Sequence, residues 1–258
     1  MGKMSSGLLA WVVMLFACAG CSVKEDREVC PGRLMLDFSG VDASVGSLAL
    51  LVTGPDGVAL RDVIVSSDFK ENYVREVPHG MLNVNIDCGA DDFIDEESGL
   101  VIPVGCECPP VYMQSFTADT RGEIYYKKVE LHKNHCCLTV KLRGRDVMPY
   151  NIAVRGSVDG YALDGSPRRG EFCCLAYPED SEITVKVPRQ MDASLMLEVE
   201  DENGISKSFA IGEYIMASGY DWNAEDLSDI TVTLDYYITG VTVLVQKWDD
   251  EFVFDLVL

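Results

Sequence analysis

The stretch "LMLEVEDENGISKSFAI" (195–211) decides the fold, because the alternating segment "LMLEVE" is followed by an Asn-Gly pair and a second short run. Alternation of apolar and polar residues with a period of two is typical of a strand that is buried on one face. Asn203 and Gly204 tolerate the positive φ values of a type I′ turn. The stretch therefore predicts a β-hairpin.

The same alternation recurs along the chain, so strands are the dominant predicted element. It is seen in "LNVNIDC" (82–88), "EITVKV" (182–187), "DITVTLDY" (229–236) and "GVTVLV" (240–245). Turn signals separate the strands at Pro55-Asp56-Gly57, Asp159-Gly160 and Asp164-Gly165. We expect helix only as short pieces near residues 91–97 and 221–227, the second capped by Asn223. The predicted fold class is all-β, built from β-sandwiches.

Length and composition predict two domains. The chain has 258 residues, of which 48% are hydrophobic and 24% are charged, as in folded globular proteins. Two strand-like runs in residues 125–144 are separated by the polar "HKNH" (132–135). We therefore place an N-terminal domain at residues 30–132 and a C-terminal domain at residues 133–258.

The charge of the chain excludes one class of partner. The formal net charge is −21 and the isoelectric point is about 4.4. Such an acidic surface repels phosphate groups, so we expect no nucleic-acid partner.

Residues 1–20 are predicted to be a signal peptide. Lys3 is the only charged residue among them, and the ten residues "LLAWVVMLFA" (8–17) carry no charge. A run of this length is too short to span a bilayer, which takes about 20 residues, but it suits the apolar part of a secretory signal. The small residues Ala19 and Gly20 follow it.

Export makes disulfides the first expectation for the cysteines. Eight cysteines lie beyond Cys21: Cys30, Cys88, Cys106, Cys108, Cys136, Cys137, Cys173 and Cys174. Eight cysteines allow many pairings, so the connectivity stays open, with Cys30 expected to be one partner. Neighbours on a strand face opposite sides, so the pattern predicts that Cys88 and Cys136 point inward and Cys137 outward. An inward cysteine is alternatively a small buried apolar residue.

No cluster of side chains predicts a metal or cofactor site. The segment "HKNHCC" (132–137) offers two histidines and two cysteines, but its spacing is not that of a zinc finger, and a strand sends the two cysteines apart. We interpret it as a polar interdomain turn. The acidic segment "DDFIDEES" (91–98) lacks the spacing and the central glycine of an EF-hand, which indicates a solvated loop.

The sequence also offers no catalytic motif. The chain has three histidines and carries no G-x-S-x-G elbow, P-loop or H-E-x-x-H. We therefore expect a protein that is not an enzyme. An aromatic cluster is interpreted as core and strand packing rather than as a sugar-binding platform: Tyr214, Tyr220, Trp222, Tyr236 and Tyr237.

The segment "CAGC" (18–21), followed by "SVKED", resembles a bacterial lipoprotein signal, in which the cysteine after small residues is lipidated. This resemblance implies that Cys21 becomes an acylated amino terminus, and that residues 21–29 form a lipidated tether. Cys18, which follows "LFA", is the alternative lipid attachment point, and an ordinary secreted protein is the other alternative. The run Lys24, Glu25 and Asp26 resembles the signal that sends some lipoproteins to the outer face of the outer membrane.

Two longer segments resemble the FimB/Mfa-type fimbrial anchor subunits, the lipoproteins at the base of type V pili. They are "CSVKEDREVCPGRLMLDFSG" (21–40) and "FAIGEYIMASGYDWNAEDLSDITVTLDYYITGVTVLV" (209–245), with Gly-Tyr-Asp-Trp (219–222) the most distinctive part. The resemblance implies two transthyretin-like β-sandwich domains in tandem on the cell surface. It also implies that the protein holds a pilus to the outer membrane through lipid on Cys21, limits the length of the pilus and contacts a fimbrial stalk subunit.

The segment "EFVFDLVL" (251–258) is the candidate partner strand. Its apolar face consists of Phe252, Phe254, Leu256 and Leu258. An open sheet edge can be completed by a strand of another subunit, but the same pattern also fits a last strand packed in its own sandwich. The alternative function is that of a surface carbohydrate-binding lipoprotein, using Trp222 or Trp248.

Overall fold

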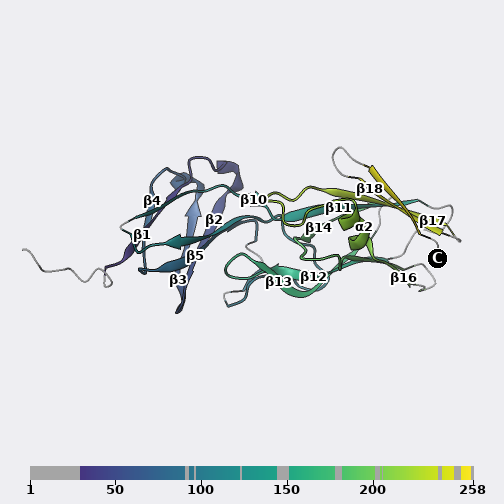
Figure 1. Cartoon of the computed structure of the whole chain (residues 1–258), viewed down its shortest axis with the longest axis horizontal. Coiled ribbons are helices and arrows are strands. Elements are labelled where there is room, and N and C mark those ends of the chain that lie inside the picture. The colour runs from purple at the N-terminus through teal and green to yellow at the C-terminus, as the bar shows by residue number, and fades with distance from the viewer. Residues whose placement is uncertain are drawn as a thin grey trace, which may run out of the picture.

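The alternating segments form mostly antiparallel strands, which build two β-sandwiches that follow each other along the long axis of the molecule (Figure 1). The computed structural model describes residues 30–90, 93–95, 97–122, 124–143, 151–177, 182–200, 204, 206–237, 240–246 and 251–256. Within residues 235–256, only the side chains of Val245 and Phe252 are described.

The first sandwich consists of a three-stranded and a five-stranded sheet. The smaller sheet has the order β4 (Tyr73–Val77), β1 (Gly32–Asp37), β9 (Tyr125–Lys128), with β1 parallel to β9. The larger has the order β10 (His132–Lys133), β8 (Tyr112–Asp119), β5 (Met81–Cys88), β2 (Ser47–Gly54), β3 (Gly57–Val65). Two 3-10 turns, η1 (Ala43–Val45) and η2 (Ser66–Asp68), complete it.

The core of the first sandwich follows the alternation of the sequence. Strand β5 buries Leu82, Val84 and Ile86, and Cys88 is buried in phase with them, which confirms its predicted inward direction. The predicted turn at Pro55-Asp56-Gly57 is also confirmed, because Gly54 pairs with Gly57, and Gly57 takes a positive φ of 108°.

The second sandwich has a similar plan. One sheet has the order β14 (Glu182–Pro188), β11 (His135–Arg143), β17 (Ile230–Tyr237), β18 (Gly240–Gln246), β19 (Glu251–Leu256). The other has the order β16 (Ser206–Phe209), β15 (Met196–Glu200), β12 (Asn151–Tyr161), β7 (Gly99–Val101), β6 (Ile94–Asp95), and β13 (Pro167–Ala176) also pairs with β12. The all-β prediction and the β-sandwich architecture are confirmed.

The predicted hairpin is formed by β15 and β16. Glu200 pairs with Ser206, and Gly204 between them has a φ of 76°. The remaining turn residues lie outside the described part of the chain, so the turn type stays a prediction.

The helix predicted at residues 221–227 is wrong, and the structure has an α-helix that was not predicted. The described α-helix is α2 (Ile211–Ala217), which buries Ile211 and Ile215 one helical turn apart. Within residues 91–97, Phe93 lies in a 3-10 turn, with its N–H 2.9 Å from the oxygen of Ala90, and β6 follows it; Asp91, Asp92 and Glu96 lie outside the described residues. Residues 221–227 form turns in which Asp221, rather than Asn223, accepts a backbone hydrogen bond, at 2.8 Å from the nitrogen of Asn223.

A segment at residues 90–111 leaves the first sandwich and packs into the second before the chain returns through β8. Its backbone bonds to β12 and β14, with Ile102 N–H 2.8 Å from the oxygen of Asp159 and Cys108 N–H 2.9 Å from that of Lys186. Its apolar side chains belong to the second core: Ala90, Leu100, Ile102, Cys108 and Val111. The two sandwiches are therefore joined by chain that passes between them more than once. We call residues 90–111 the crossing segment.

Candidate functional site

The described chain begins at the tip of the first sandwich that is remote from the second. Strand β5 runs from Met81 to Cys88 towards the second sandwich, and β8 runs back to Asp119, so the ends of these strands at Met81 and Asp119 form the remote tip. Gly32 lies against this tip, because a Cβ atom on it would come within 2.7 Å of Thr120 Cβ. The predicted signal peptide, Cys21 and the run Lys24, Glu25 and Asp26 all lie outside the described residues.

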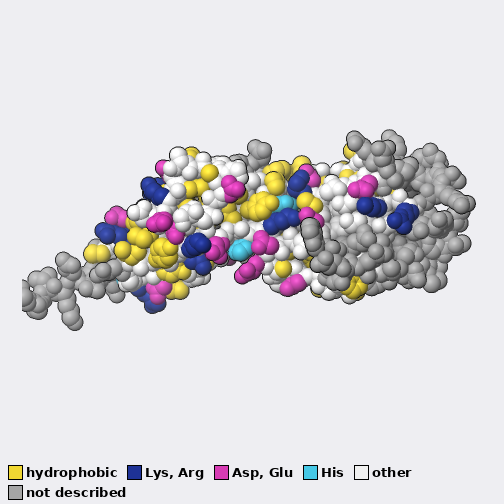
Figure 2. Space-filling view, turned by 90° about the horizontal axis from the view of Figure 1, so that it is seen from above, with side chains coloured by type: hydrophobic (Ala, Val, Ile, Leu, Met, Phe, Trp, Pro, Cys, Tyr) yellow, Lys and Arg dark blue, Asp and Glu magenta, His cyan; other side chains and the backbone are white. Residues whose placement is uncertain are grey.

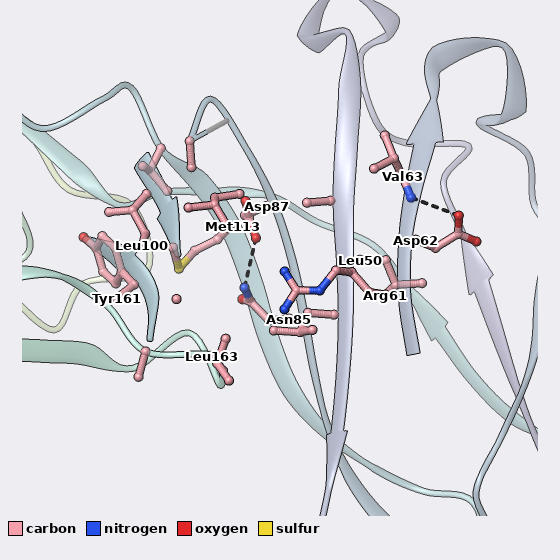
Figure 3. A pocket seen from close by; sticks show the side chains of 17 residues that line it. Leu50, Arg61, Asp62, Val63, Asn85, Asp87, Leu100, Met113, Tyr161 and Leu163 are labelled. Atoms are coloured by element: carbon pink, nitrogen blue, oxygen red, sulfur yellow. Dashed lines mark hydrogen bonds between the residues drawn. The ribbon is translucent and has the colours of Figure 1, made fainter. Parts of the chain in front are cut away.

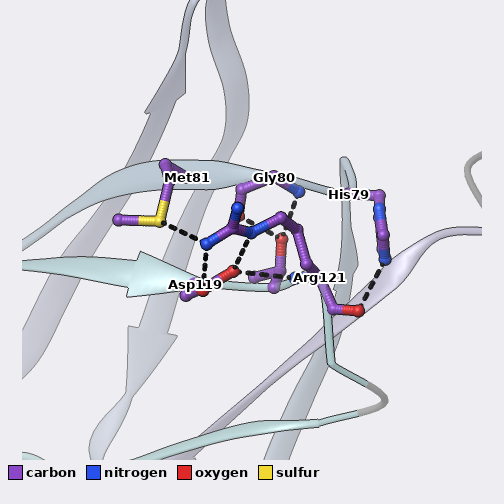
Figure 4. A network of polar contacts seen from close by, with 6 residues as sticks. His79, Gly80, Met81, Asp119 and Arg121 are labelled. Carbon is purple, nitrogen blue, oxygen red and sulfur yellow. Dashed lines mark hydrogen bonds and ion pairs between the residues drawn. The ribbon is translucent and has the colours of Figure 1, made fainter.

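A polar network closes this remote tip (Figure 4). Arg121 binds Asp119 with two hydrogen bonds of 2.8 and 2.6 Å, and its Nη2 lies 3.9 Å from the sulfur of Met81. The hydrogen bonds from Arg121 lower the pKa of Asp119 to about 2. Buried Thr120 donates to the oxygen of Pro78 and accepts from Gly80 N–H, which ties the two hairpin ends together. The network explains the shape of the tip but places no reactive group there.

At the opposite end, β19 lies at an edge of its sheet. Among the described residues it pairs with β18 alone, so its other side has backbone N–H and C=O groups without a strand partner. Phe252 pairs with fully buried Val245 and packs against the second core. The side chains of Phe254 and Leu256, and the whole of Leu258, lie outside the described part of the structure.

The junction between the sandwiches is fixed by two aspartates that follow the Gly-Tyr-Asp-Trp segment. Asp226 accepts from Lys133 N–H at 2.7 Å and lies 3.3 Å from Nδ1 of His132. Asp229 accepts from Lys133 Nζ at 2.5 Å and from Cys137 N–H at 2.8 Å. Acidic, basic and histidine side chains gather at this waist on the face shown in Figure 2.

The two aspartates are held in their ionised form. The backbone hydrogen bond from Lys133 is the main cause that lowers the pKa of Asp226. Burial alone would raise the pKa of Asp229, but the hydrogen bonds from Lys133 and Cys137 outweigh it, and the pKa is lowered. The linker between the sandwiches, residues 132–135, is therefore bound by charge-assisted hydrogen bonds near neutral pH.

Arg189 connects the same linker to the loop that follows Trp222. Its Nε donates to Asn134 Oδ1 at 3.0 Å. Its Nη1 donates to the carbonyl oxygens of Trp222 and Ala224 at 2.5 and 2.7 Å, and its Nη2 to that of Glu225 at 3.2 Å. One guanidinium thus satisfies three loop carbonyls and a linker side chain, which makes it the centre of the junction. Nothing in the sequence predicted this role.

The Gly-Tyr-Asp-Trp segment is structural in the molecule. Trp222 is only 3% exposed and packs edge-on against Tyr220, with ring centroids 4.7 Å apart. A sugar platform must present an aromatic face to solvent, so Trp222 cannot serve as the platform that the carbohydrate alternative required. Trp248, the other candidate, lies outside the described residues.

The histidine–cysteine segment behaves as a polar junction. Cys136 is fully buried and Cys137 only partly, so the predicted inward and outward directions are confirmed. Burial raises the pKa of Cys136 to about 12. His135 is buried, with Nδ1 3.2 Å from the oxygen of Val111. The described residues hold no group of three or more His, Cys, Asp or Glu side chains placed to bind a metal ion.

The predicted disulfides are not formed in this structure. None of the eight described cysteines is joined in a disulfide: Cys30 and Cys106 are exposed, Cys137 is partly buried, and the others are buried. For the neighbouring pair Cys136 and Cys137, the strand geometry explains this, because the two side chains leave opposite faces of β11.

A cavity of about 180 Å³ lies between the sandwiches (Figure 3). One wall is the outer face of β2, β3, β5 and β8, and the other includes β7 and the loop after β12. The cavity has mainly apolar walls, although Asn85 and Asp87, joined by a 3.0 Å hydrogen bond, also line it. Gly165, in the loop after β12, approaches so closely that a Cβ atom there would lie 1.8 Å from Ser115 Oγ. The two sandwiches are therefore in close contact at Gly165, beside the cavity.

None of the helices in the described part of the chain is long and apolar enough to cross a membrane.

Comparisons with known proteins identify the fold. No family sequence model matches the chain, and no curated protein matches it by sequence. Among solved structures, the fold is similar to that of the fimbrial anchor protein Mfa2 from Porphyromonas gingivalis, with a TM-score of 0.62 and 13% identity over 88% of this chain and 100% of the Mfa2 chain.

Two further structures are similar over most of their length. A protein from Bacteroides ovatus that is proposed to be an adhesin has a TM-score of 0.60 and 12% identity, over 88% of this chain and 95% of its own. A protein from Bacteroides thetaiotaomicron that is proposed to bind polysaccharide has a TM-score of 0.60 and 14% identity, over 85% of this chain and 99% of its own. The resemblance noted in the sequence is thus confirmed at the level of the fold.

Proposed function

We propose that this chain is an outer-membrane lipoprotein that anchors a fimbria to the cell surface and takes part in its assembly and length control. The observation that carries the proposal is the position of the two ends. The described chain begins at the tip remote from the second sandwich, and the edge strand β19 belongs to that second sandwich. The similarity in fold to an anchor protein over the whole length of that protein supports the same role.

In this arrangement, lipid on Cys21 holds the first sandwich at the membrane, and the second sandwich projects away from it. Each buried CH₂ group of an acyl chain contributes about 0.8 kcal/mol, so several chains together give a stable anchor. A fimbrial stalk subunit then adds a strand to β19, whose outer edge has no strand partner in the described part of the chain. A tensile force on the fimbria is then transmitted between the sandwiches through the junction at Arg189, Asp226 and Asp229.

Replacing Cys21 by alanine is expected to abolish acyl labelling and to release the protein from the membrane, because the attachment sulfur is lost. Labelling with a fatty-acid analogue in the native host, followed by membrane fractionation, measures both effects. Cys30→Ala is the matched control, since this cysteine is close in sequence and exposed, and it should stay labelled. Labelling that persists without Cys21 and disappears in Cys18→Ala would move the attachment point to Cys18.

A pair of proline variants tests the contact at β19. Successive N–H groups of a strand point to opposite edges, so one of Val253 and Phe254 donates towards β18 and the other towards the open edge. The variant that removes the inner N–H should lose about 1–3 kcal/mol of unfolding free energy. The other should keep its thermal stability but no longer co-purify with the stalk subunit.

Thermal unfolding and co-purification from native membranes are measured on both variants. The contact at β19 is refuted if the stable variant still binds the stalk subunit as well as the unchanged protein does.

A further inference from the structure

The crossing segment is attached to strand β13 at a cysteine. Gly105 forms a parallel bridge with Cys174, in which Gly105 N–H donates to the oxygen of Cys173 at 2.7 Å and Leu175 N–H lies 3.5 Å from the oxygen of Gly105. Cys106, the next residue of the segment, is exposed. A thiol of the crossing segment therefore lies next to the paired cysteines of β13.

The spacing suits a covalent bond between Cys106 and Cys174. A strand spacing of about 4.8 Å and, at right angles to it, one Cα step of about 3.8 Å place the two Cα atoms about 6 Å apart. A disulfide spans about 4.4–6.8 Å between Cα atoms, so this distance is within its reach. Burial, and to a smaller extent the charges of Glu107, Cys173 and Cys106, raise the pKa of the Cys174 thiol to about 11.

The two thiols differ in a way that sets the order of reaction. Cys174 is buried on the core-facing side of β13 with Phe172, so an oxidant cannot reach it directly. Cys106 is exposed to solvent. The exposed thiol is the entry point, and the buried thiol resolves the intermediate.

We propose that Cys106 and Cys174 form a disulfide that joins the crossing segment to β13. The oxidant is another disulfide, such as oxidised glutathione or the active-site disulfide of an exported oxidoreductase. The thiolate of Cys106 attacks the oxidant, its disulfide breaks, and one thiol leaves. The thiolate of Cys174 then attacks the sulfur of Cys106 and releases the second thiol. Two protein thiols are oxidised, one oxidant disulfide is reduced, and the two protein protons pass to the released thiols.

The bond would fix the crossing segment to the second sandwich, into whose core its apolar side chains already pack. The crossing segment begins at the end of β5, in the first sandwich, and β13 belongs to the second. A disulfide between them keeps the crossing segment attached to β13 when the chain is under tension or partly unfolded. The inference does not require the proposed fimbrial role, because a disulfide oxidant in solution is enough to form the bond.

The test uses the full chain extracted from membranes, and the same chain reduced and then incubated with oxidised glutathione. Remaining thiols are blocked with N-ethylmaleimide under denaturing conditions, and the digest is examined by mass spectrometry. We expect a reducible peptide pair joining Cys106 and Cys174, about 2 Da lighter than the two free peptides together. Cys106→Ser and Cys174→Ser should each remove it, whereas Cys137→Ser, on another strand, should leave it unchanged.

Either of two results overturns the proposal. One is that both cysteines are fully alkylated after incubation with oxidised glutathione. The other is that Cys106 is joined to a different cysteine, such as Cys173. A second readout is the unfolding midpoint of the oxidised chain, which should fall on reduction in the unchanged protein but not in Cys106→Ser.

Discussion

Replacing Gly165 by alanine is expected to lower the free energy of unfolding by about 2–4 kcal/mol, because it combines backbone strain with a steric clash. Gly165 has a φ of 79°, which disfavours any residue with a side chain. The new Cβ would also lie 1.8 Å from Ser115 Oγ and 2.9 Å from Ser115 Cβ, so a hydroxyl rotation alone cannot relieve the overlap. The loop after β12 must then move away from the first sandwich.

Gly46 provides the matched control. Its φ is 82°, almost the same, but a Cβ there would meet nothing within 4 Å. Gly46→Ala should therefore show only the backbone cost, about 1 kcal/mol, part of which is offset because alanine restricts the unfolded chain. Denaturant unfolding of both variants measures the difference. Adding Ser115→Gly to Gly165→Ala should recover part of the loss. Equal losses at the two glycines would mean that the contact between the sandwiches is loose.

Period-two alternation predicts those parts of the fold in which one face of a strand is buried. Strand β11 is the clearest case, because Leu138 and Val140 are fully buried together with Cys136, as the pattern requires. The hairpin of β15 and β16 follows from its alternation and from a glycine that takes a positive φ. In both cases local sequence and tertiary burial point the same way.

The crossing segment could not be predicted from period-two alternation. Strands β6 and β7 have two and three residues, too few to show a period. The pair Asp159-Gly160 was predicted to be a turn but lies inside β12, at a register shift. Gly160 is needed there because a Cβ atom would lie 1.9 Å from the oxygen of Leu100 in β7. A glycine required by a distant strand cannot be distinguished in the sequence from one required by a turn.

In the candidate site, too, the local sequence indicated one part, while another part depends on distant residues. The Gly-Tyr-Asp-Trp segment was recognised from the sequence, but its role depends on Arg189, which follows β14 and gives no local signal. The acceptors of Arg189 are mostly backbone oxygens, and every residue type has one. Only the fold brings Asn134 and the loop after Trp222 to the same guanidinium.

Replacing Arg189 by alanine is expected to lower the free energy of unfolding by about 2–4 kcal/mol. The three loop carbonyls and Asn134 Oδ1 lose a charged donor, and partly buried acceptors that stay unpaired are costly. The loop that carries Asp226 should loosen as well, so the linker at Lys133 loses part of its support. Chemical denaturation and protease sensitivity of the linker measure the two effects.

Arg121→Ala is the control variant, because it also removes an arginine but at an exposed position away from the junction. Arg121 also makes several hydrogen bonds, to Asp119 and Met81, but its side chain is 63% exposed, so water can replace them. Arg121→Ala should change stability little, and the proteolysis of the linker not at all. Arg189→Lys should fall between, because one ammonium group keeps the charge but cannot reach all four acceptors in the geometry of a guanidinium. If Arg189→Ala is as mild as Arg121→Ala, the junction is held by the two aspartates and not by this arginine.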